Sequence, residues 1–226
     1  MGFIRGLAAI NNVMDEQKVR AENASNYQKV SWLQLSDGQS VKVRFVEELD
    51  EDSPGYDESR GLAVVISEHS SPDDFRIKAV CTAETEGRCF ACEQARKPDA
   101  KPGWRYRLRY YTNVVVDDGS GQPKVQVWSQ GVSTRSAFNI IREYAMDMGA
   151  VSNLVWKLKR NGMKTETSYL LMPQGIDAEP FDWSKFEFFN LEKIVREVPY
   201  ADQEEFYFGV PSEANAGATT EATINW

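Results

Sequence analysis

The residues with the clearest chemistry lie in one window between positions 69 and 92. This window holds His69, the only histidine of the chain, and all three cysteines, Cys81, Cys89 and Cys92. One imidazole and three thiolates form the ligand set of a closed, tetrahedral structural zinc site. Cys89 and Cys92 are the ends of a Cys-x-x-Cys turn, which can place two sulfurs on one ion. The spacing therefore predicts one structural Zn²⁺ held by these four residues.

Three other interpretations of this window are possible. The simplest is a surface histidine with three unrelated thiols, because cysteine often serves as a small buried apolar residue. A redox Cys-x-x-Cys would follow a strand and open a helix, but here it follows a Gly-Arg turn and leaves Cys81 and His69 without a role. A nucleobase deaminase needs His-x-Glu and Pro-Cys-x-x-Cys, and neither is present. The odd number of cysteines argues against a secreted disulfide framework and indicates a reducing compartment.

Charge is distributed unevenly along the 226 residues, whose formal net charge is −8. Residues 1–100 carry 12 Lys and Arg against 18 Asp and Glu. Residues 101–172 carry 11 against 5, and residues 173–226 carry 3 against 11. Because a basic centre lies between acidic flanks, the chain could still bind nucleic acid despite its negative net charge. No apolar run approaches the ~18 residues of a membrane span and no basic-then-apolar leader is present, so we expect neither a span nor a signal peptide.

The basic centre begins with a stretch in which cations and aromatic residues alternate, at residues 103–116. On a strand, Arg105, Arg107 and Arg109 would share one face, about 7 Å apart, roughly matching the phosphate repeat of an extended single strand. Tyr111 would join this face, and the other face would carry Trp104, Tyr106, Leu108 and Tyr110. The alternative is a core strand with a salt-bridged outer face, which needs acidic partners that this segment lacks. The pattern favours a nucleic-acid surface.

Periodicity and turn signals place the remaining elements around this strand. A hairpin through Asp37-Gly38 is expected to carry Lys42 and Arg44 on its outer face, which an ordinary solvated face would explain equally well. Residues 133–148 read as a helix that ends at Gly149. The other expected elements are a helix at 3–14, strands at 62–66, 75–80 and 124–131, a hairpin of 153–160 with 167–172 bearing Lys157, Lys159 and Arg160, and a helix at 181–198.

About seven short strands with one helix before the final hairpin predict a mainly β fold with some α. The expected architecture is an OB-fold-like Greek-key barrel with an inserted zinc-binding loop and an acidic C-terminal tail, and such barrels commonly bind single strands. The expected segments are an N-terminal helix or arm at 1–28, the OB-fold core at 29–172 with a zinc subdomain at about 68–102, an acidic helical region at 173–210 and a disordered tail at 211–226.

Four features in residues 30–172 resemble the single-stranded-DNA-binding (helix-destabilising) proteins of T-even-type bacteriophages. They occur in the family's order, and the metal window is the most specific of them. They are Trp32…Leu35-x-Asp37-Gly38-x-x-Val41-x-Val43-Arg44-Phe45, His69…Cys81…Cys89-x-x-Cys92, a basic segment ending in Tyr110-Tyr111 before Asn113 and a Val run, and Lys124-Val125-x-x-Trp128.

The resemblance implies an OB-fold whose basic cleft holds single-stranded DNA, with aromatic residues stacked on bases and zinc pinning a subdomain beside the cleft. Carried over, it implies that Tyr110, Tyr111 and Trp128 stack on bases. Three further sets of cations would contact the strand: Arg105, Arg107 and Arg109, then Lys157, Lys159 and Arg160, and Lys42 with Arg44.

The resemblance also implies partners and a setting. The acidic C-terminal region would recruit replication and recombination proteins, with Trp226 as a candidate contact, and the protein would act in the cytoplasm of the infected host cell. The family's N-terminal basic motif for cooperative binding is absent from residues 1–28, so self-association on DNA stays open.

The leading hypothesis is therefore sequence-independent binding of single-stranded DNA in phage DNA replication, recombination and repair, driven by counterion release and base stacking. The rival from another class is a zinc-stabilised structural or interaction protein of a replisome or virion without nucleic-acid contact. We expect no enzyme, because the one histidine is assigned to zinc and the carboxylates have no recognisable catalytic spacing.

Overall fold

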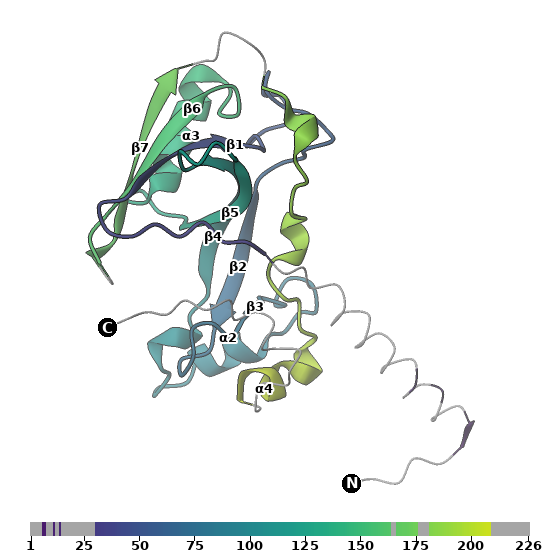
Figure 1. Ribbon diagram of the computed structural model, residues 1–226. Helices are drawn as coiled ribbons and strands as arrows, with labels where there is room; N and C mark the ends of the chain where they lie inside the picture. The colour runs from purple at the N-terminus through teal and green to yellow at the C-terminus, as the bar shows by residue number, and fades with distance from the viewer. Residues whose placement is uncertain are drawn as a thin grey trace. The chain divides into compact units, whose positions relative to one another are not determined.

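The computed structural model describes most of the chain between residues 30 and 208 (Figure 1). The described residues are 6, 7, 11, 14, 30–163, 166–175 and 181–208. The chain divides into two compact units. The barrel unit comprises Val30–His69 and Arg105–Glu192, and the cysteine unit comprises Met1–Lys29, Ser70–Trp104 and Lys193–Trp226. The described part is mainly β, as predicted from the strand count.

One antiparallel sheet of seven strands organises this part of the chain. Its order is β3-β2-β4-β1-β6-β7, and β5 pairs with the other edge of β4. The strands are β1 Ser40–Phe45, β2 Val64–Ser70, β3 Lys78–Val80, β4 Arg107–Asp117, β5 Lys124–Gly131, β6 Val155–Asn161 and β7 Ser168–Gly175. Because β1 pairs with both β4 and β6, the β4–β5 hairpin and the β6–β7 hairpin are joined into one curved sheet.

Strict alternation along β1 shows why this segment forms a strand with one buried face. Val41, Val43 and Phe45 are buried, whereas Ser40 and Lys42 are exposed. This period of two suits a half-buried strand and excludes a helix. The buried side chains join those of β4, β5, β6 and β7 in a single core, in which Phe45 packs against Trp128 and Trp156.

The helix α3 (Ala137–Met148) packs on this core through Ile141, which is fully buried. It ends at Gly149, whose φ of 81° lies in the left-handed region, so a glycine there is favoured. The predicted end of the helix is thus confirmed. Its N-cap is Ser136, two or three residues later than the Ser133 or Thr134 expected from the sequence.

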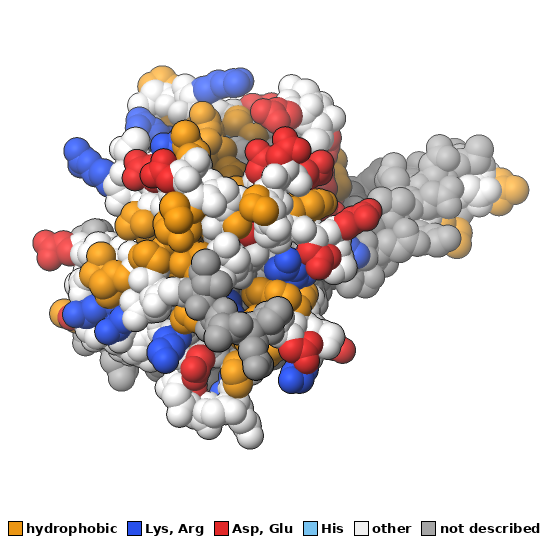
Figure 2. All heavy atoms as spheres, turned by 90° about the horizontal axis from the view of Figure 1, so that it is seen from above, with side chains coloured by type: hydrophobic (Ala, Val, Ile, Leu, Met, Phe, Trp, Pro, Cys, Tyr) orange, Lys and Arg blue, Asp and Glu red, His pale blue; other side chains and the backbone are white. Residues whose placement is uncertain are grey.

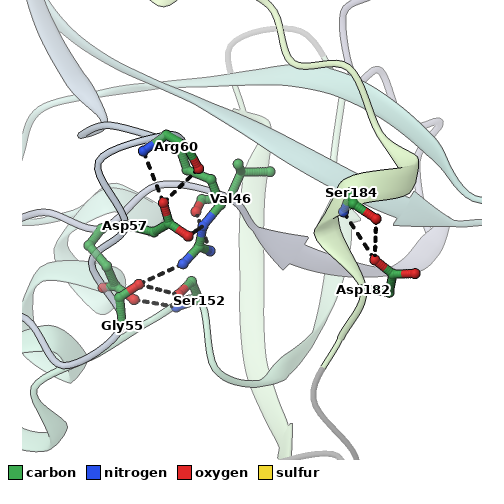
Figure 3. Close-up of polar contacts among 9 residues, drawn as sticks. Val46, Gly55, Asp57, Arg60, Ser152, Asp182 and Ser184 are labelled. Atoms are coloured by element: carbon green, nitrogen blue, oxygen red, sulfur yellow. Dashed lines mark hydrogen bonds and ion pairs between the residues drawn. The ribbon is translucent and has the colours of Figure 1, made fainter.

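The acidic loop after β1 is anchored to the barrel by its own charged residues. Glu48 is buried and accepts hydrogen bonds from the backbone N–H groups of Val151 (2.9 Å) and Ser152 (2.9 Å). Arg60 donates to the carbonyl oxygens of Val46 (3.0 Å) and Gly55 (2.8 Å) and lies 3.6 Å from Asp57 (Figure 3). The loop is therefore a fixed part of the barrel unit.

The cysteine unit has a small aromatic core of its own. Its elements are β3, α2 Phe90–Ala95, the 3-10 turn η1 Pro102–Trp104 and α4 Tyr200–Phe208. Trp104 packs edge-on against Phe90 and Tyr207, with ring centroids 6.0 and 5.1 Å away. The zinc subdomain expected at about 68–102 therefore also recruits α4, which is distant in sequence.

Two local expectations were wrong. Residues 30–35 do not pair with β1: Leu33 donates its N–H to the carbonyl of Val127 (2.9 Å), so this segment runs beside β5. The helix expected at 181–198 is replaced by two 3-10 turns, η3 Trp183–Lys185 and η4 Leu191–Lys193, and the helix α4 follows Pro199.

The expected N-terminal helix lies almost wholly outside the described residues, and so does the expected tail with Trp226. Among the helices that are described, none has the length and apolar character that a membrane crossing requires.

Candidate metal centre and basic outer face

The four predicted metal ligands come together. The ligand atoms of His69, Cys81, Cys89 and Cys92 all lie within 4.8 Å of one another. The sulfurs of Cys81 and Cys92 are 3.6 Å apart, and none of the three cysteines forms a disulfide. Zn–S bonds of about 2.3 Å in a tetrahedron place two sulfurs about 3.8 Å apart, whereas a disulfide needs about 2.05 Å. The donor set and its spacing can therefore hold one metal ion, and the sulfur-rich set fits zinc.

Local structure explains how the ligands are presented. His69 lies near the end of β2, Cys81 directly follows β3, and Cys89 is the N-cap residue of α2. Cys92 lies in the first turn of α2, where the N–H of Glu93 donates to the carbonyl of Cys89 (3.0 Å). A strand end, a strand exit and a helix start thus converge on one point.

The surroundings of the thiols favour a bound cation. Burial, together with the neighbouring Cys81 and Cys89 sulfurs, raises the pKa of the Cys92 thiol to about 12. A thiol in such surroundings stays protonated without a metal, whereas a coordinating cation deprotonates it outright. His69 and Cys89 are buried and Cys81 and Cys92 are half-buried, as is expected of a structural site.

The basic strand is shorter and less exposed than the alternation predicted. β4 begins only at Arg107, and Trp104 lies in η1 with its side chain buried. Arg107 and Arg105 are exposed, but Arg109 is half-buried, lies 3.7 Å from Glu68 and donates to the hydroxyl of Ser129 (2.8 Å). The acidic partner that the segment itself lacks is supplied by β2, whose Ile66 and Glu68 lie opposite Arg109 and Arg107.

The three aromatic residues expected to stack on bases are instead buried. Tyr110 and Tyr111 are 0% exposed and Trp128 is 2% exposed. Tyr110 and Trp128 belong to the barrel core, and the hydroxyl of Tyr111 donates to Glu68 (2.5 Å). Because stacking needs an open ring face, these residues cannot stack on a strand in this conformation. Tyr110 and Trp128 are buried because the core packs on their face of the sheet, and Tyr111 is buried because Trp32 and Glu68 cover it.

Lysines of β1 and β6 form a compact basic cluster on the outer face of the barrel. Lys42 lies directly opposite Lys157, and Ser40 lies opposite Lys159, so all three lysines share one face. The only carboxylate directly opposite any of these three in the described strand pairings is that of Asp117, on the other side of Lys42. Like charges directly opposite destabilise a strand pair, so this cluster favours an anionic ligand.

Two arginines that were predicted to contact DNA instead make contacts within the protein. Arg160 donates to the carbonyl of Leu35 (2.6 Å) and to the hydroxyl of Thr167 (3.1 Å). The guanidinium of Arg44 lies over the ring of Phe181, 4.5 Å from its centroid. Both arginines therefore hold neighbouring segments in place, and only the face of Arg44 away from this ring could meet a ligand.

Sequence reasoning missed one exposed aromatic residue. Tyr106 is 60% exposed, lies between Arg105 and Arg107, and packs edge-on against the ring of His69 with centroids 6.3 Å apart. The alternation assigned it to a core face, but β4 starts one residue later, so no strand buries it. In the sequence, the signal that could have identified Tyr106 is its position as an aromatic residue between two arginines.

Figure 2 shows a face on which acidic and basic side chains are interspersed with hydrophobic ones, without a continuous field of one sign. Comparison of the chain with protein-family models, curated protein sequences and solved structures gives no match. The arguments about function therefore rest on the residues themselves.

Proposed function

We propose that the protein binds single-stranded DNA without sequence preference. The observation that carries this proposal is the cluster of Lys42, Lys157 and Lys159 on the outer face of two paired strands. Their mutual repulsion is relieved when phosphates lie among them, and the counterions released from the strand add to affinity.

A second contact would come from the start of β4. Arg105 and Arg107 supply charge on either side of Tyr106, whose exposed ring can stack on a base. Stacking contributes about 1–3 kcal/mol per base and accepts every base, which suits sequence-independent binding. Tyr106 takes the role that the resemblance assigned to Tyr110, Tyr111 and Trp128.

The connectivity supports an OB-type barrel. β1, β4 and β5 form an antiparallel meander, α3 follows, and the β6–β7 hairpin returns to pair with β1. Five strands with one helix before the last hairpin are what a partly open Greek-key barrel of this type requires, and such barrels bind single strands.

Zinc would act structurally in this proposal. Three thiolates and one imidazole leave no open coordination position for chemistry. The metal would fix the loop that carries the cysteines and, through His69, the residue against which Tyr106 packs. We propose no enzymatic activity. A role in phage replication, recombination and repair, with partners at the acidic C-terminal region, follows from the resemblance alone.

Titration with oligo-dT at two salt concentrations, followed by intrinsic Trp and Tyr fluorescence, tests the proposal. Five cations in contact predict a slope of log K against log salt of about −3.5, because single strands release roughly 0.7 counterion per neutralised phosphate. Affinity should then fall on the order of 100-fold between 50 and 200 mM salt. No binding, or binding that ignores salt, would favour the interaction protein without nucleic-acid contact.

Matched variants locate the surface. Lys157→Ala should weaken binding and reduce the salt slope by about 0.7, whereas Lys101→Ala should change neither, because Lys101 is paired with Asp73 at 2.6 Å. Tyr106→Ala should weaken binding by the stacking contribution, and Tyr106→Phe should restore it. Equal affinities for Tyr106→Ala and Tyr106→Phe would remove this ring from the site. Tyr111→Ala is unsuitable as a test because it would open a cavity inside the fold.

A further inference from the structure

The last described helix, α4, packs against the loop that carries the cysteines (Figure 1). Its central contact is Gln203, which is 0% exposed. The Gln203 side-chain oxygen accepts the N–H of Phe90 (2.9 Å). Its amide nitrogen donates to the hydroxyl of Thr82 (2.8 Å) and to the carbonyl of Val198 (2.8 Å). One buried amide from the C-terminal part of the chain thus satisfies three groups in the cysteine unit.

Two of those three groups are next to metal ligands. Thr82 follows Cys81, and Phe90 follows Cys89. The first N–H groups of a helix have no partner within it and need an acceptor. At α2 the N-cap residue Cys89 makes no side-chain cap bond, and Gln203 accepts the N–H of Phe90 instead. Because Gln203 supplies this acceptor, the sulfur of Cys89 is not needed as a cap and can face the other ligands.

A hydrogen bond also links the two ends of the loop between Cys81 and Cys89. The hydroxyl of Thr82 donates to the carbonyl of Arg88 (2.8 Å) while accepting from Gln203. This closes a network from the residue after Cys81 to the residue before Cys89. A change at Gln203 therefore acts on both sides of the loop.

Outside this network, α4 holds the loop through its first and last turns. The hydroxyl of Tyr200 donates to Glu93 (2.9 Å), and the guanidinium of Arg88 lies 3.5 Å from the Tyr200 ring centroid. At the other end Tyr207 stacks with Phe90, centroids 6.5 Å apart. These contacts bind α4 to the segment that contains Cys89 and Cys92, with Gln203 at the centre.

We propose that Gln203 is a positioning residue for the metal centre, so that metal occupancy and docking of α4 are coupled. The proposal rests on the zinc site proposed above. Coupling between two equilibria is reciprocal: loss of the Gln203 hydrogen bonds weakens metal binding, and loss of the metal weakens the docking of α4.

The test begins with the metal content of the wild-type protein and of two variants. Gln203→Leu removes the three hydrogen bonds at similar volume, and Glu204→Leu places the same side chain at an exposed position of the same helix. Transfer of zinc to a chromophoric chelator should be about 10-fold faster in Gln203→Leu, since outer-shell partners of metal ligands typically contribute 10–100-fold in affinity. Glu204→Leu should match the wild type.

The reciprocal effect is measured by amide hydrogen exchange. Removal of the metal should raise exchange in residues 200–208 while β1 and β6 of the barrel unit keep their protection. Gln203→Glu serves if Gln203→Leu does not fold, because it keeps an acceptor for the Phe90 N–H and loses the two donated bonds. Its zinc release should be intermediate.

The outcomes separate the two proposals. Wild-type protein without bound metal overturns the zinc site and the coupling together. Metal-loaded wild type with equal release rates in Gln203→Leu and Glu204→Leu, or with unchanged exchange in residues 200–208 on chelation, overturns the coupling and leaves the zinc site intact.

Discussion

Glu47 is buried at 2% exposure and should make the stability of the barrel unit depend on pH near neutrality. Its carboxylate accepts from the hydroxyl of Thr112 (2.7 Å), the N–H of Asn113 (2.8 Å) and the side-chain amide of Asn113 (2.6 Å). Burial raises its pKa from 4.5 to about 7, although these hydrogen bonds oppose the shift. Between these two values the folded protein holds a proton that the unfolded chain has released.

The sign and size of the effect follow from linkage. A carboxyl whose pKa is raised by folding stabilises the protein while it stays protonated, and this contribution is lost as pH rises through the folded value. With the values 4.5 and about 7, stability should fall by roughly 2–3 kcal/mol between pH 5 and pH 8 from this residue alone. Metal release at low pH acts in the opposite direction, so the comparison must be made against a variant that keeps the metal site.

Urea unfolding of the wild type and of Glu47→Gln across pH 5–8 isolates the contribution. Gln does not titrate, so the difference in unfolding free energy between the two proteins should change by roughly 2–3 kcal/mol over this range. Glu51→Gln, at an exposed position in the same loop, is the control and should give a much smaller change. A Glu47→Gln difference that stays constant with pH would mean that the hydrogen bonds from Thr112 and Asn113 outweigh burial.

Three further perturbations have clear expected results. Gly55→Ala would place a Cβ 2.2 Å from a carboxylate oxygen of Glu48, so we expect a loss of about 1–3 kcal/mol in urea unfolding. Ile141→Ala removes a fully buried side chain from the core and should cost about 2–5 kcal/mol. Chelation of the metal should unfold the cysteine unit and expose Trp104, seen as a red shift of its fluorescence, while far-UV circular dichroism retains the strand signal of the barrel unit. A spectrum that does not change on complete metal removal would contradict the last of these.

The candidate metal ligands could be predicted from sequence because the chain contains few histidines and cysteines. The chain has one histidine and three cysteines, and all four lie within 24 residues. The strands that form hairpins and the helix ending at Gly149 could also be predicted, because period and turn chemistry are local properties. The prediction of the first hairpin was wrong because its pairing is not local. Asp37-Gly38 does mark a turn, but the segment before it pairs with Val127, more than 90 residues away.

The helix α4 could not be found from its apolar pattern. Its two buried positions are Gln203 and Tyr207, a polar and an aromatic residue four apart. Gln203 is buried because it has hydrogen-bond partners in a distant loop, which no local pattern reveals. We expected an acidic helical region at 173–210, but we placed its helix at 181–198, before Pro199.

The burial of Tyr110 and Tyr111 and the exposure of Tyr106 have one cause, the point at which β4 enters the sheet. From residue 110 to 116 the side chains of β4 are buried on both faces of the sheet. The core encloses Tyr110, Val114 and Val116, whereas Trp32 packs on Tyr111 and Glu47 binds Asn113. Ligand contact along β4 is therefore confined to its start and to the strands beside its end, where Lys42 lies opposite Asp117. Ten residues of strand separate Arg107 from Asp117, which is about 33 Å if the strand is straight and less along the curved sheet. In the proposed function, a strand of single-stranded DNA that reaches both places crosses the outer face of the sheet, and this distance suits the roughly 4–16 nucleotides that an OB-fold covers.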